Sequence, residues 1–254
     1  MVIEVTRTRS GISPGGGSIK HSTASIFVCP ERTFEIENGV IAEQSCPVDF
    51  WIDGKCSCCG EDLVGDKGVI ENCIFSILEE IGENPDRPGL KDTPKRVARM
   101  YKEIFKGYDP EQKPILTAFK NEDDGISYDE MIMDSGFFHS YCEHHMALFS
   151  GQYFCAFIPN KKIIGLSKIA RVVDYYSSKL QIQERLVTEI ANELEKAIQP
   201  LGLGVMLRAF HSCKEARGIK NKGAMITSDL RGNFREQKVK EEFLTLIKMD
   251  SDFR

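Results

Sequence analysis

The sequence predicts a mixed α+β protein, because segments with two different hydrophobic periods alternate along its second half. Residues 152–158 and 203–210 are apolar and strand-like, whereas apolar residues recur every three or four positions in stretches that begin near Ser167 and Gln181. The chain has 254 residues, of which 41% are hydrophobic, enough to fill one large core or two small ones. A disordered or collagen-like chain is therefore excluded.

Residues 1–66 are predicted to form a flexible tail followed by a cysteine-rich segment. The Gly/Ser-rich run at residues 10–18 has too few apolar side chains to pack. Further on, Cys56 and Cys59 have the CxxC spacing of a zinc knuckle and are followed by a glycine. The segment is a candidate structural zinc site, with free or buried thiols as the alternative; its four candidate ligands are Cys29, Cys46, Cys56 and Cys59.

Residues 67–127 are predicted to form a helical hairpin and a linker. An amphipathic helix begins near Lys67 and ends near Gly82, and a second begins at Pro94 after an N-cap at Thr93. Proline and acidic residues at 109–127 indicate the linker. The remaining residues, 128–254, are expected to form the catalytic domain.

Charge and hydropathy limit the classes of partner. The formal net charge of −5 argues against broad electrostatic binding to nucleic acid. No run approaches the roughly 18 apolar residues of a membrane helix. We expect a soluble, cytoplasmic protein without nucleic-acid or membrane partners.

Two short segments gather the side chains that best suit a metal ion. Cys142 and His145 have CxxH spacing, and Cys213 can add a third ligand from a distant strand end. Two thiolates and one imidazole suit zinc, and a set of three leaves the fourth position open to water, as in catalytic sites. The alternative is a group of buried thiols with a packed histidine.

Two histidines beside these ligands are candidates for proton transfer. His144 and His211 would be free imidazoles, and hydrolysis of a C–N bond requires a proton at the leaving nitrogen.

Two further segments are a candidate site for a phosphorylated small molecule and a candidate contact for a guanine base. Ser167 is a plausible helix N-cap, and Lys168 and Arg171 lie one turn apart behind it, so this helix start is a candidate anion site. Arg217 adds a cation four residues after Cys213. Separately, a carboxylate at Glu184 can accept two N–H groups from guanine, with the amide of Gln183 beside it. Ordinary solvated surface charge is the alternative for each of these residues.

Together these segments resemble the GTP cyclohydrolase I family. The likeness runs from about Ile70 to Leu246 and rests on CEHH at 142–145, GLSK at 165–168, QERL at 183–186 and HSCKEARG at 211–218. The resemblance implies a tunnelling fold, an antiparallel sheet with two helices on one face. It also implies a homo-oligomer, usually a toroidal homodecamer with active sites at subunit boundaries.

The resemblance also implies a reaction and roles for individual residues. Such enzymes hydrolyse GTP at C8, release formate and form 7,8-dihydroneopterin triphosphate, which feeds folate, biopterin or 7-deazapurine synthesis. By this likeness one zinc ion per subunit and its water act at C8, with proton transfer by the two free histidines. The implied metal ligands are Cys142, His145 and Cys213; the implied catalytic residues are His144, His211 and Ser167; the implied substrate contacts are Gln183, Glu184, Lys168, Arg171 and Arg217.

Three departures from the family pattern bear on pocket shape and turnover. Met146 and Ala147 replace the usual Leu-Pro pair, Ser178-Lys179 replaces a double arginine, and Lys214 replaces a common methionine. The alternatives are another tunnelling-fold enzyme, such as the reductase of the 7-deazaguanine pathway, and an inactive GTP-binding scaffold. The intact CEHH cluster argues against the first, and the retained ligands and Glu184 argue against the second.

Overall fold

The computed structural model describes residues 68–122, 125 and 127–252, together with the backbone of six short strands before them. Two compact units, residues 1–98 and 99–254, divide the chain. The predicted tail and the thiols of the cysteine-rich segment lie outside the described residues. The six strands form antiparallel pairs; they are β1 (Val2–Thr6), β2 (Thr23–Phe27), β3 (Ile36–Glu37), β4 (Val40–Ile41), β5 (Trp51–Ile52) and β6 (Lys55–Cys56).

Both helices predicted between residues 67 and 108 are present. They are α1 (Val69–Glu80) and α2 (Thr93–Ile104). Gly82 follows α1 with a φ of 89°, the left-handed conformation that glycine adopts most readily after a helix. The N-cap predicted at Thr93 is wrong by one residue, because the amide of Arg96 already donates to the carbonyl of Asp92.

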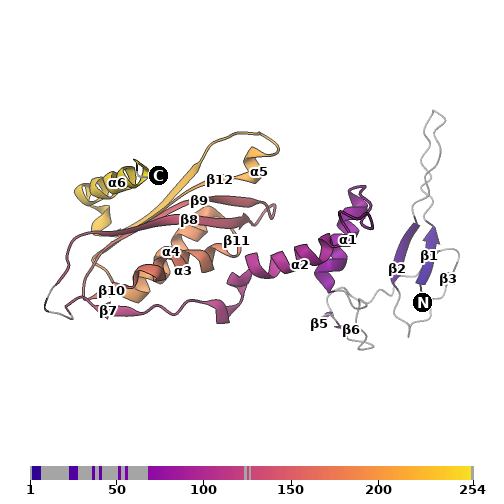
Figure 1. The fold of residues 1–254 in the computed structure, drawn as a ribbon, viewed down its shortest axis with the longest axis horizontal. Helices are drawn as coiled ribbons and strands as arrows, with labels where there is room; N and C mark the ends of the chain where they lie inside the picture. Colours follow the sequence, from indigo (N-terminus) through magenta and orange to yellow (C-terminus); the bar gives the residue numbers. More distant parts are fainter. Residues whose placement is uncertain are drawn as a thin grey trace. The chain divides into compact units, whose positions relative to one another are not determined.

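A five-stranded sheet organises residues 99–254 (Figure 1). Its order is β11-β8-β9-β12-β13, and every neighbouring pair is antiparallel except the short parallel edge pair β11 and β8. The strands are β8 (Ile132–Cys142), β9 (Leu148–Ile158), β11 (Leu180–Gln181), β12 (Gly202–His211) and β13 (Met225–Gly232).

A second, small sheet pairs β7 (Ala118–Lys120) with β10 (Lys162–Ile164). The stretch predicted as a linker therefore contains a strand, preceded by two short 3-10 turns at Lys106–Tyr108 and Pro110–Gln112. The sequence did not predict this strand, because the proline and acidic residues around it are typical of a linker. Its pairing partner lies about 40 residues further along the chain.

The large sheet separates two cores, because alternate residues of a strand point to opposite faces. On one face, Tyr153, Cys155 and Phe157 pack with α3 (Leu166–Ser177) and α4 (Gln183–Ile198). The predicted antiparallel sheet with two helices on one face is thus confirmed, apart from its parallel edge strand.

On the opposite face lies α6 (Gln237–Asp252), which the periodicity analysis did not predict (Figure 1). Phe154 and Ala156 pack there against Phe234 and Phe243. Gly204 permits this contact, since a Cβ atom at that position would lie 2.4 Å from the Phe234 ring. None of the helices in the described residues has the length and apolarity needed to cross a membrane.

Replacing Phe243 by alanine should lower the free energy of unfolding by about 3–5 kcal/mol, because its fully buried ring fills the second core. Its neighbour Leu244 is 36% exposed, so Leu244→Ala should cost less than about 1 kcal/mol. Urea unfolding at one fixed protein concentration measures both values, and equal losses would contradict the assignment of α6 to the core.

Candidate metal centre

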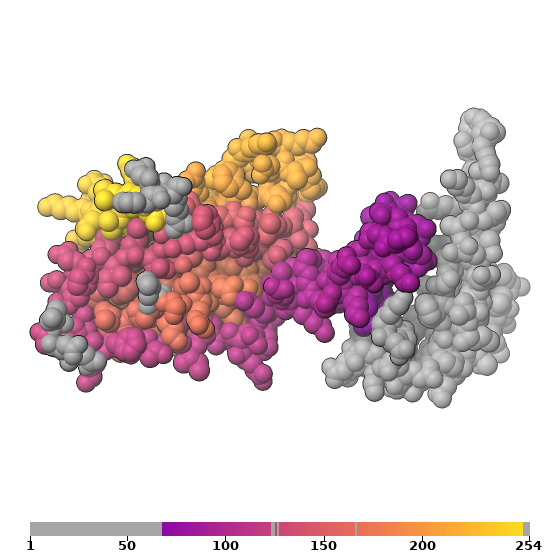
Figure 2. All heavy atoms as spheres, viewed as in Figure 1, coloured from indigo at the N-terminus to yellow at the C-terminus, as the bar shows by residue number. Residues whose placement is uncertain are grey.

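The register of the sheet brings two strand ends together. Tyr141 pairs with Leu148 and His211 pairs with Phe149, so the C-terminal ends of β8 and β12 flank the start of β9. Cys142 is the last residue of β8, and Cys213 lies in α5 (Ser212–Glu215), directly after β12. Figure 2 shows α5 and the following loop as part of a gold lobe that projects from the sheet.

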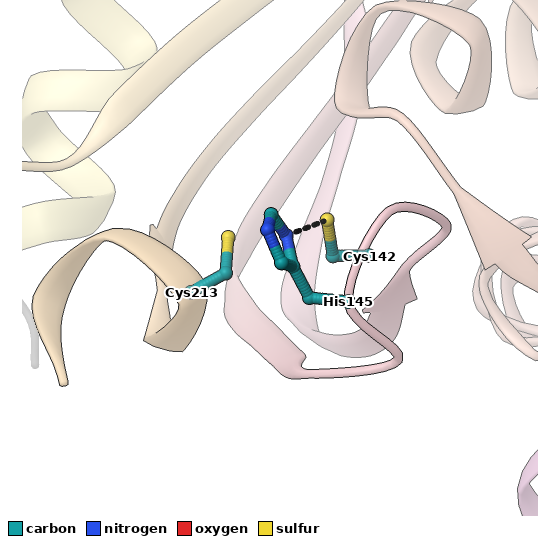
Figure 3. A group of neighbouring side chains, drawn as sticks. All are labelled: Cys142, His145 and Cys213. Atoms are coloured by element: carbon teal, nitrogen blue, oxygen red, sulfur yellow. Dashed lines mark hydrogen bonds between the residues drawn. The ribbon is translucent and has the colours of Figure 1, made fainter. Parts of the chain in front are cut away.

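The three predicted ligands lie next to one another, and Figure 3 shows the His145 ring between the two sulfur atoms. One donor atom from each of Cys142, His145 and Cys213 lies within 4.8 Å of the other two. The Cys142 Sγ atom is 3.6 Å from His145 Nδ1. Cys142 is buried, Cys213 is half-buried and His145 is exposed, so the cluster opens to one side.

A tight turn after β8 positions His145. The amide of Met146 donates to the carbonyl of Cys142, and the amide of Cys142 donates to the carbonyl of Ala147, each at 2.8 Å. Met146 has a φ of 52°, a left-handed conformation uncommon for a side chain of its size. The turn is therefore closed by hydrogen bonds although Met146 and Ala147 replace the usual Leu-Pro pair.

The donor set fits a zinc ion. In a tetrahedral zinc site with metal–ligand bonds of about 2.0–2.3 Å, neighbouring ligand atoms lie roughly 3.3–3.8 Å apart. The distance of 3.6 Å between Cys142 Sγ and His145 Nδ1 is within this range. Burial and the neighbouring Cys142 thiol raise the pKa of Cys213. A divalent cation between the two sulfur atoms would reverse this effect and favour both thiolates.

The two histidines predicted to transfer protons, His144 and His211, border the cluster without belonging to it. His144 is largely exposed, with Nδ1 3.8 Å from Cys142 Sγ. His211 stacks on Phe149 with ring centroids 4.5 Å apart and an interplanar angle of 4°. Burial lowers the pKa of His211, and Glu184 partly opposes this effect. These surroundings favour the neutral form of the His211 ring.

The predicted substrate contacts differ in their exposure to solvent. Glu184 is exposed at the start of α4, close enough to influence His211, and Arg217 is exposed and acts electrostatically on Cys213. Gln183 is 1% exposed, and its amide faces the interior. The predicted contact between Gln183 and guanine stays a prediction.

Ser167, Lys168 and Arg171 lie in the first turns of α3, away from the metal cluster of the same chain. Helix α3 follows the far end of the sheet and returns to β11, which pairs with β8 beside Cys142. Its 12 residues span about 18 Å. Lys168 Nζ donates to the Ile115 carbonyl at 2.9 Å.

The predicted N-cap at Ser167 is wrong. Gly165 is the N-cap residue, with extended backbone, and the helix starts at Leu166. Glycine has no side chain to satisfy the first amides, so this helix start keeps donors available for another acceptor.

Sequence reasoning missed a polar network behind the metal turn. Arg185 donates to Glu143, to the side chain of Gln181 and to the carbonyl of Leu180. This network connects the turn to α4 and β11. Arg185 belongs to the QERL segment, but nothing in its spacing indicated Glu143 as partner.

These features define an α+β protein with a candidate metal site at one end of its sheet. A family model described as GTP cyclohydrolase I matches residues 70–248. The GTP cyclohydrolase 1 of a Sulfurihydrogenibium species is 49% identical over 188 residues, or 73% of this chain and 97% of the relative. That of Caldanaerobacter subterraneus is 44% identical over 186 residues, or 72% and 97%.

The chain therefore belongs to the GTP cyclohydrolase I family and is a hydrolase of that family. This confirms the resemblance inferred from the sequence. A solved structure of the archaeosine synthase QueF-Like in the apo form aligns with a TM-score of 0.33 at 14% identity, covering 39% of this chain and 92% of that chain. That likeness is too distant to add to the family assignment.

Cys213→Ala should lower the zinc content by about one ion per chain, because two remaining ligands hold the ion weakly. Zinc is measured by mass spectrometry of the purified protein after dialysis. Cys73→Ala, at an exposed thiol in α1, is the matched control and should retain all zinc. Unchanged zinc in Cys213→Ala would contradict the ligand set.

Proposed function

We propose that this protein is a zinc-dependent GTP cyclohydrolase I that opens GTP at C8, releases formate and forms 7,8-dihydroneopterin triphosphate. The observation that carries the proposal is the cluster of Cys142, His145 and Cys213, flanked by two histidines that are not ligands. Family membership supports GTP as the substrate.

The three ligands would hold zinc, which when bound acts as a Lewis acid and lowers the pKa of water. His211 is partly buried, and burial lowers its pKa, so it can accept a proton near the purine ring. His144 is largely exposed beside Cys142 and can donate a proton to a nitrogen of the imidazole ring as the C–N bond breaks.

Glu184 suits recognition of guanine. Its carboxylate is exposed, starts a helix and lies near His211. A carboxylate accepts from both the N1–H and the 2-amino group of guanine, whereas adenine offers no such pair. This contact would select guanine over adenine and orient C8.

The triphosphate would bind Ser167, Lys168, Arg171 and Arg217. The first three lie at the far end of α3 from the metal cluster of the same chain, which supports a site built from two copies. A ring of copies, which the family resemblance describes as a toroidal decamer, would bring the start of α3 in one subunit to the metal cluster of another.

Turnover of GTP tests the proposed function. Zinc-replete protein should release formate and give neopterin fluorescence after oxidation, whereas Cys213→Ala should give neither. Glu184→Gln should raise KM for GTP by about tenfold or more, since the amide replaces one acceptor by a donor. Absence of turnover by the assembled, zinc-loaded protein would contradict the proposal.

Mixing two inactive variants tests the shared site. Lys168→Ala and Cys213→Ala damage different parts of it, so mixed and reassembled oligomers should regain activity at about one quarter of their sites. Each variant reassembled alone is the control. No recovery in proven mixed oligomers would contradict a site built from two copies.

A further inference from the structure

The side-chain amide of Gln183 is held in one orientation by two strands. Its Nε2 atom lies 3.1 Å from the carbonyl oxygens of Leu207 in β12 and Met225 in β13, and 3.1 Å from Thr227 Oγ1. Backbone carbonyls can only accept hydrogen bonds. The end of the amide between them must therefore be the NH₂ group, so the orientation follows from the surroundings.

This orientation determines which nitrogen of His211 carries hydrogen. The Gln183 Oε1 atom lies 2.9 Å from His211 Nε2. An amide oxygen can only accept, so Nε2 must donate and carry the hydrogen atom. In the neutral ring the lone pair then lies on Nδ1. The parallel stack on Phe149 fixes the plane of the same ring.

We propose that Gln183 is a positioning residue that fixes the orientation and tautomer of His211, and that it is not the contact that recognises guanine. Its burial supports this role, because both ends of the amide are already bonded inside the protein. The catalytic consequence rests on the function proposed for His211; the tautomer itself does not.

Gln183→Met tests the role by separating kcat from KM. Methionine keeps the length of the side chain but neither accepts from Nε2–H nor donates to the two carbonyls. We expect kcat to fall by about 10²-fold, the loss associated with a misplaced general base, with KM for GTP changed by less than about threefold. Thr188→Ala, on the exposed side of the same helix, is the control and should leave both constants unchanged.

A rise in KM with unchanged kcat would overturn the proposal, since it would make Gln183 a substrate contact. GTP binding measured by calorimetry with metal-free protein gives a readout that does not need turnover. Gln183→Met should bind GTP with the affinity of the wild type. Glu184→Gln should bind it more weakly.

The tautomer can also be read in the wild type, without any variant of Gln183 that might fail to fold. Magic-angle-spinning NMR of sedimented, ¹⁵N-histidine-labelled protein distinguishes a protonated Nε2 from a protonated Nδ1. The chain has five histidines, and the signal lost in His211→Asn identifies the relevant ring. We expect hydrogen on Nε2. Hydrogen on Nδ1 would overturn the proposal even if GTP turnover were normal, and hydrogen on Nε2 without turnover would instead contradict the proposed function.

Discussion

The antiparallel register of β8, β9 and β12 is the constraint on which the site depends. Cys142 and Cys213 are about 70 residues apart in sequence, yet the pairing of β8 and β12 with the two sides of β9 brings them to the same end of the sheet. A shift by one residue would turn each strand's side chains to the opposite face. The packed cores on both faces oppose such a shift. Core packing therefore maintains the register that places the metal ligands.

The same strands support the chemistry beside the metal ligands. Carbonyl groups of β12 and β13 orient the amide of Gln183, and Phe149 of β9 supports the ring of His211. The strands thereby hold the side chain of His211, which is the last residue of β12. A positioned base loses little entropy on reaching the transition state, which is the benefit of preorganisation.

The sequence predicted the ligands because CxxH spacing and a distant Cys–His pair are compact chemical signals. It predicted β9, β12, α3 and α4 from their periods. It missed β8, in which Gly136 and polar residues interrupt the apolar pattern, although α6 did carry a visible signal in Val239, Phe243 and Ile247 at spacings of four. The burial of Gln183 was not predictable, since a polar residue at a helix start usually faces water and its bonding partners come from two distant strands.

Anomalous diffraction at the zinc absorption edge, from crystals of the full chain, would locate the metal ion and its ligands directly. We expect an anomalous peak bonded to Cys142 Sγ, His145 and Cys213 Sγ, with His144 and His211 outside the coordination sphere. Zinc bound elsewhere in zinc-replete crystals, with these three side chains apart, would contradict it.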